Sequence, residues 1–253
     1  SQRDTIRAAH VTPKTEDRSS ILRWATHGWN DEERTRAALS SPALQQVAAF
    51  EELKTCTEDP KRAVALIRDH NLPRECVPSE LLNDPDVWNA LLHAGEYGMP
   101  ITALIRNLGK MAKGGLLTQG SDAAHFVADR LTNVQALRHG RVHPLRLLIA
   151  LCQYAVGHGE KGSLTWTPVQ RVVDALDAAF YLAFETIEPT GKRMLLAVDC
   201  SGSMTAQATG QVTNLSAREL AAACALVQFA TEPNAEIIGF TMRSMELRIS
   251  AKM

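Results

Sequence analysis

Three oxygen-bearing side chains, Asp199, Ser201 and Ser203, occupy every second position of the segment Asp-Cys-Ser-Gly-Ser. This segment follows the apolar run 194–198, which is typical of a buried parallel strand. Open α/β sheets bind their ligands at the carboxyl ends of such strands. Carboxylate and hydroxyl oxygens suit a hard divalent cation, and magnesium keeps water as its remaining ligands. The sequence therefore predicts a divalent metal site, for Mg²⁺, in this loop.

The same three residues have a second interpretation, in which they form a polar turn that caps the next helix. The order strand, loop, helix favours the metal site. A hydrolase is disfavoured, because Ser201 has no Gly-x-Ser-x-Gly surroundings and no motif ties a histidine to it. A metal-dependent nuclease would need more carboxylates than Asp199 alone in the loop. We expect a protein that is not an enzyme.

Basic residues carry the other candidate chemistry. The formal net charge of −1 indicates no general affinity for nucleic acid, so a site for RNA must come from local clusters. Arg3, Arg7 and His10 follow at intervals of four and three residues and share one face of a helix. That face predicts a track for RNA phosphates. A solvated basic helix end is the alternative.

A second cluster, Arg106, Lys110 and Lys113, has the same helical spacing and precedes the helix stop at Gly114. Cations on one helix face would bind the phosphates of single-stranded RNA. Alternatively, they are ordinary exposed residues with a favourable charge at a helix C-terminus. The spacing alone leaves both interpretations open.

A third basic cluster surrounds the turn at Gly140 and the helix start at Pro144, where an anion would be favoured. Its alternative is a histidine cap with solvated neighbours. The cluster consists of Arg138, His139, Arg141, His143 and Arg146.

Helical periodicity dominates the chain before residue 190, and it must position these basic residues. Proline recurs near the first turns of the helices, where its missing N–H costs nothing. Successive helical pairs are similar to an α-solenoid of HEAT or armadillo type. The predicted helices are 19–27, 31–39, 42–55, 60–70, 85–93, 100–113, 123–131, 144–156 and 168–186.

The pattern changes near 188–192 to strand, loop, helix and strand, with a helix at 214–230 and strands at 235–241 and 245–249. We therefore predict a mainly α fold in two parts. A HEAT-like helical-repeat domain spans 1–190, and the first part of a doubly wound α/β domain spans 191–253.

Composition limits the class of protein to which the chain can belong. A hydrophobic content of 45% supports a sizeable core, and five scattered cysteines fit a reducing cytoplasm. No apolar stretch has transmembrane length, so no membrane association is expected. The aromatic residues lie in apolar helical patterns, which predicts core positions rather than a base-stacking platform. They are Trp24, Trp29, Trp88, Trp166, Phe180 and Tyr181.

Several stretches together resemble the Ro ribonucleoprotein autoantigen family, and Asp-x-Ser-x-Ser after a strand resembles the first metal-binding segment of a von Willebrand factor A domain. The stretches are Met99-Pro-Ile-Thr-Ala-Leu-Ile-Arg-Asn-Leu-Gly-Lys-Met111, His143-Pro144 with Leu147-Leu-Ile-Ala-Leu151, Gly157-His-Gly-Glu-Lys-Gly162, Ala175-Leu-Asp-Ala-Ala-Phe-Tyr181 and Glu188-Pro-Thr-Gly-Lys-Arg-Met-Leu-Leu-Ala-Val-Asp199.

The resemblance implies a TROVE module of helical repeats, closed into a ring by the A domain. Such proteins bind small noncoding Y RNAs outside the ring and misfolded RNA ends in its central hole. The family's metal site also uses a Thr and an Asp from later loops, which we expect to lie beyond residue 253. The resemblance therefore implies that this sequence is a fragment with an incomplete metal site.

The segment Thr5-Ile-Arg-Ala-Ala-His-Val-Thr-Pro13 resembles a family stretch whose histidine lies on the RNA surface. This implies that His10, with Arg7 and Arg3, contacts RNA. The expected function is RNA binding in RNA quality control or stability, as a cytoplasmic monomer with an exoribonuclease partner. The alternative is a metal-dependent protein-binding scaffold that has no RNA ligand.

Overall fold

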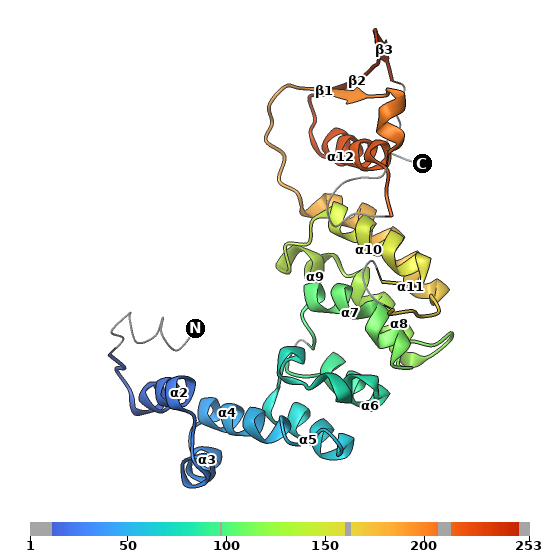
Figure 1. Cartoon of the computed structure of the whole chain (residues 1–253). Helices are drawn as coiled ribbons and strands as arrows, with labels where there is room; N and C mark the ends of the chain where they lie inside the picture. The colour runs from blue at the N-terminus through green and yellow to red at the C-terminus, as the bar shows by residue number, and fades with distance from the viewer. Residues whose placement is uncertain (1–11, 97, 160–162, 207–213, 248–253) are drawn as a thin grey trace. The chain divides into compact units, whose positions relative to one another are not determined.

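The computed structural model describes residues 12–96, 98–159, 163–206 and 214–247 (Figure 1). Its internal contacts divide the chain into two compact units, Ser1–Met99 and Pro100–Met253. This division lies elsewhere than the predicted domain boundary at 190/191, which stays a prediction. No helix in the described part of the chain is both long and apolar enough to cross a membrane.

The N-terminal unit is helical, and its helix starts follow from the sequence. Pro42, Pro60 and Pro85 each occupy the first turn of a helix. Asn30 and Glu33 form a capping box, in which each side chain accepts a hydrogen bond from the other residue's backbone N–H. The helices are α2 (Glu16–His27), α3 (Asp31–Ala38), α4 (Pro42–Leu53), α5 (Pro60–His70) and α6 (Pro85–Leu92).

Two apolar clusters hold this unit together. Ala37, Leu44 and Ala48 form a small core, against which Ile21 and Trp29 pack. Further along the chain, α5 packs on α6, where Trp88 is fully buried and its indole N–H donates to the Leu82 carbonyl at 2.8 Å. That bond satisfies the one polar group of the largest core side chain.

The helices of the C-terminal unit pack on neighbours in sequence and on helices further away in sequence. In it, α10 lies against both α7 and α11, and α11 also packs on α8 (Figure 1). The helices are α7 (Ile101–Lys113), α8 (Asp122–Leu131), α9 (Val134–His139), α10 (Pro144–Val156) and α11 (Gln170–Leu182). A 3₁₀ helix, η3 (Ala183–Thr186), continues α11.

A small sheet follows in the same unit. Parallel strands β1 (Met194–Asp199) and β2 (Ala235–Phe240) are joined by α12 (Ala217–Thr231), which packs on both. The short β3 (Ser244–Glu246) pairs antiparallel with β2. The order strand, helix, strand is the order in which a doubly wound α/β domain begins. The predicted fold class, mainly α followed by the start of an α/β domain, is confirmed, while HEAT-type repeats remain a prediction.

The predicted core positions of the aromatic residues are confirmed only in part. Trp88 and Phe180 are buried, whereas Trp24, Trp29 and Trp166 are half-buried. Tyr181 is 38% exposed, so its prediction as a core residue was wrong. The reason is local: Ala179 and Phe180 occupy the buried face of α11, and Tyr181 lies one position beyond it.

Candidate metal loop and candidate RNA interface

The loop with the three oxygen-bearing side chains starts where β1 ends. Asp199 pairs in register with Phe240 of β2, and the Cys200 N–H donates to the Phe240 carbonyl at 2.8 Å. The Ser201 N–H donates to Asp199 Oδ1 at 2.8 Å. A 3₁₀ helix, η4 (Gly202–Thr205), then follows. Sheet register therefore places this segment, the metal loop (199–203), at the carboxyl edge of the sheet.

The side chains of the metal loop do not cap a helix. Ser201 precedes η4 without a side-chain cap bond, and Ser216 with Glu219 caps α12 through a capping box. The alternative interpretation is therefore wrong about helix capping, but its polar turn is present, because the hydrogen bond from the Ser201 N–H to Asp199 is that of an Asx turn. Arg218, in the first turn of α12, donates to the Ser201 carbonyl at 3.3 Å and so ties the loop to the helix.

Two of the three candidate side chains have oxygens at a spacing that fits a divalent cation as well as a hydrogen bond. Ser201 Oγ and Ser203 Oγ are 2.9 Å apart. Adjacent ligands of an octahedral Mg²⁺ at about 2.1 Å would be about 3 Å apart, so the two hydroxyls have the spacing of such a pair. Hydrogen bonds from the backbone and side chain of Ser201 lower the pKa of Asp199, which keeps its carboxylate charged. In the described residues no three His, Cys, Asp or Glu side chains gather as a metal site, so this site depends on hydroxyls.

The second candidate site is a groove between α7 and α10 with a volume of 680 Å³. Arg106 and Lys110 of α7 and Arg146 of α10 contribute its positive charge. Between them lie apolar side chains, including Ile105 and Ile149. We call this feature the basic groove. Two of the predicted RNA-binding residues, Arg106 and Lys110, therefore meet on one surface.

One wall of the basic groove is fixed by close packing. A Cβ on Gly109 would lie 2.8 Å from the Trp166 ring, so only glycine allows α7 to approach the indole this closely. The indole N–H donates to the Tyr154 carbonyl at 3.0 Å, and the Tyr154 hydroxyl accepts from the Val169 N–H at 3.3 Å. Trp166, which lies between α10 and α11 rather than in a helix, thus forms a packed wall of the groove.

The other predicted basic residues lie elsewhere. Lys113, Arg138 and Arg141 do not line the basic groove, and Arg138 donates to the Glu185 carbonyl at 3.0 Å. His143 accepts from the Leu145 N–H at 3.2 Å, so it caps α10 as its alternative interpretation proposed. Arg3, Arg7 and His10 lie outside the described residues.

By sequence, Arg146 is assigned to a different cluster from Arg106 and Lys110 of α7, which it joins in the groove. It belongs to the third basic cluster in sequence but joins the second in space. The spacing of residues in α10 could have indicated the face on which Arg146 lies with its neighbours in the groove. Those residues are Arg146, Ile149, Ala150 and Gln153, at intervals of three, one and three residues.

Comparison with known proteins covers both parts of the chain. The TROVE domain family matches residues 30–153, and the Ro60 vWA domain family matches residues 193–253. The chain is 38% identical to the RNA-binding protein RO60 of Deinococcus radiodurans, over 100% of this chain and 45% of that protein. It is 42% identical to the RNA-binding protein RO60 of Caenorhabditis elegans, over 82% of this chain and 31% of that protein.

The chain belongs to the Ro60 family. The crystal structure of the Deinococcus radiodurans RO (RSR) protein has a TM-score of 0.86 to this chain at 36% identity, covering 100% of this chain and 49% of that one. The chain thus spans half the length or less of these Ro60 relatives. Membership confirms the predicted family, whereas the roles of the individual metal and RNA residues remain predictions.

Proposed function

We propose that this chain binds RNA as part of a Ro60-family protein, with the basic groove as one contact surface. The observation that carries this proposal is the convergence of Arg106, Lys110 and Arg146 from two helices onto one groove with an apolar floor. Cations on the rim would bind phosphates, and Ile105 and Ile149 would contact bases that are not stacked in a duplex. The groove therefore favours single-stranded RNA.

The finer function rests on the family. We propose that the RNAs are small noncoding, Y-type RNAs and the 3′ ends of misfolded RNAs, and that the role is cytoplasmic RNA quality control or stability alongside an exoribonuclease. The two curated relatives are named as RNA-binding proteins, which supports a role without catalysis. Arg3, Arg7 and His10 would supply a further RNA surface.

The metal loop supports a second candidate function, a scaffold that binds protein partners through Mg²⁺. The spacing of its two hydroxyls and the anionic Asp199 favour that metal. Asp199, Ser201 and Ser203 would hold the ion, which could then accept an oxygen ligand from a partner. RNA would play no part in that function.

Titration of the full chain with a structured RNA, with and without a single-stranded 3′ tail, at two salt concentrations tests the proposal. The double variant Arg106→Ala/Arg146→Ala should weaken binding to the tailed RNA at least about tenfold and reduce the salt dependence. Arg171→Ala, an exposed arginine of α11 outside the groove, is the matched control. Binding that is equal for both RNAs, or unchanged in the double variant, would reject the groove. Magnesium-dependent protein capture without RNA binding would favour the scaffold.

A further inference from the structure

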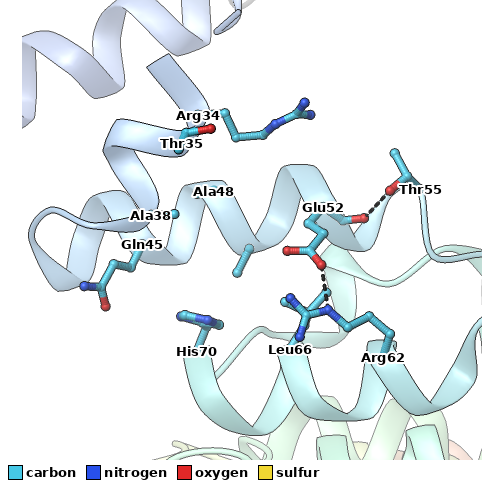
Figure 2. Close-up of a pocket in the computed structure, with 11 residues that line it drawn as sticks. Arg34, Thr35, Ala38, Gln45, Ala48, Glu52, Thr55, Arg62, Leu66 and His70 are labelled. Atoms are coloured by element: carbon cyan, nitrogen blue, oxygen red, sulfur yellow. Dashed lines mark hydrogen bonds and ion pairs between the residues drawn. The ribbon is translucent and has the colours of Figure 1, made fainter. Parts of the chain in front are cut away.

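The N-terminal unit holds a pocket of 560 Å³ that the RNA proposal does not use. Figure 2 shows Arg34 and Thr35 from α3, Gln45, Ala48 and Glu52 from α4, and Arg62, Leu66 and His70 from α5 around it. We call it the alanine pocket, because Ala38, Ala48 and Ala49 are among its lining residues. Its volume lies in the range of small-molecule sites, about 300–1,000 Å³.

The charged groups of the alanine pocket favour an anion. Arg34 and Arg62 stand on either side of α4 in Figure 2, and Glu52 is the one carboxylate among the lining residues. Arg62 Nε donates to Glu52 Oε1 at 2.6 Å, which neutralises that carboxylate and leaves both Nη groups of the arginine for another partner.

Arg34 could also exchange its present ion-pair partner for a ligand. It pairs with Asp31, whose side chain is 94% exposed, and such a solvent-exposed pair contributes little free energy. A phosphate inside the pocket would therefore compete well for this guanidinium, since arginine binds phosphate with two parallel hydrogen bonds. His70, half-buried at the end of α5, supplies a further polar group.

The floor of the alanine pocket suits the rest of a nucleotide. Ala48 and Ala49 are largely buried and line the base of the pocket with short side chains. Leu66 adds apolar surface beside them. A flat base or a sugar can lie on such a floor while the phosphate meets the arginines.

We propose that the alanine pocket binds a nucleotide phosphate ester, with Arg34 and Arg62 on the phosphate and the alanine floor under the base or sugar. The nucleotide is either free or one unit of an RNA strand, since both present the same chemistry. This site is separate in composition from the basic groove, with which it shares no lining residue.

Calorimetric titration of the full chain with adenosine 5′-monophosphate, inorganic phosphate and adenosine tests the site. We expect the monophosphate to bind more tightly than adenosine. The double variant Arg34→Gln/Arg62→Gln should weaken its binding at least about tenfold. The control Arg36→Gln/Arg68→Gln removes two exposed arginines from the same helices outside the pocket and should stay within about twofold.

Glu52→Gln separates a ligand role from a structural one. It releases Arg62 and removes a negative charge, so monophosphate binding should tighten by about threefold. A pocket that is only structural would lose stability in the Arg62 and the Glu52 variants alike, with no tightening. Where the free monophosphate binds, equally tight binding of adenosine, or unchanged or weaker monophosphate binding in Glu52→Gln, would overturn the proposal. Where it does not bind, the comparison of RNA binding decides.

A final arm identifies the source of the nucleotide. A short single-stranded RNA is titrated into Arg34→Gln/Arg62→Gln and, separately, into Arg106→Ala/Arg146→Ala. If the first variant weakens RNA binding but no free monophosphate binds, the ligand is a nucleotide of RNA. If the first variant changes neither ligand, the proposal fails, whereas an unchanged second variant rejects the basic groove alone.

Discussion

The metal loop and the basic groove differ in how the chain builds them. The metal loop has its three proposed oxygen ligands within five consecutive residues, whereas the basic groove combines α7, α10 and the segment that carries Trp166. When the residues of a site lie close together in the sequence, both the residues and their spacing can be recognised there. A composite site is visible only in fragments, because helix packing decides which faces meet.

The largest expected effect concerns the contiguous site. Asp199→Ala removes the one charged group among the proposed metal ligands, so the Mg²⁺-dependent rise in the unfolding temperature that the proposed site predicts should disappear completely. Thermal unfolding with and without Mg²⁺ measures this rise. Thr205→Ala is the control, because its hydroxyl binds the Gly202 carbonyl in the same segment without belonging to the ligand set. A rise that persists in Asp199→Ala would contradict the assignment.

Contiguity also explains what the sequence predicted well. The prolines at the first turns of α4, α5, α6 and α10 and the strand before Asp199 predicted their elements directly, because the signals are local. By contrast, α9 was missed, since its six residues are too few to show helical periodicity.

The basic residues show where prediction from sequence stopped. Arg106, Lys110 and Lys113 share a helix face, but Lys113 lies about 10 Å along the axis from Arg106 at about 1.5 Å per residue, and it does not line the groove. Arg146 joins the groove from another helix, which no spacing within α7 reveals. Sequence periodicity predicts which residues share a face of a helix. Only the packing of the helices decides which residues of that face belong to a site.

The second prediction concerns a substitution that disturbs the packing of the basic groove. Gly109→Val places a branched side chain where even a Cβ would lie 2.8 Å from Trp166, so α7 and the indole must separate. We expect a loss of about 3 kcal/mol in the free energy of unfolding and weaker RNA binding. Denaturant unfolding measures the first quantity. Ala178→Val places the same branched side chain at an exposed position of α11 without a clash. It should lose less than about 1 kcal/mol, even though alanine to valine lowers helix propensity whereas glycine to valine raises it.

A third prediction uses two lysines of α7 as a matched pair. Lys110 lines the basic groove and Lys113 does not. Lys110→Ala should weaken binding to single-stranded RNA by about three- to tenfold and lower the slope of log affinity against log salt by about one. Lys113→Ala should change affinity by less than about twofold. Equal effects of the two changes would mean that the whole helix face, rather than the groove, binds RNA.

The smallest effect concerns the turn that leads into β1. Glu232, buried at the end of α12, accepts hydrogen bonds from the N–H groups of Thr190 at 2.7 Å and Gly191 at 3.2 Å. These bonds, that of Thr190 foremost, lower the pKa of Glu232 below its ordinary value. A carboxyl group with a lowered pKa stabilises the fold above its unfolded pKa, and this contribution is lost as the pH falls through the folded pKa.

Glu232→Gln should therefore lower the unfolding temperature at neutral pH, and the difference from the unchanged chain should shrink below about pH 4, where the unfolded carboxyl group is protonated. Unfolding scans from neutral to acid pH measure this difference. Glu236→Gln, at an exposed position of β2, controls for the loss of one carboxylate. Because Glu232 holds the turn ahead of β1 and not the metal loop itself, Mg²⁺ should raise the unfolding temperature of Glu232→Gln as much as that of the unchanged chain. A smaller rise would show that the metal loop, although contiguous in sequence, depends on packing around the strand that precedes it, as the basic groove depends on packing between helices.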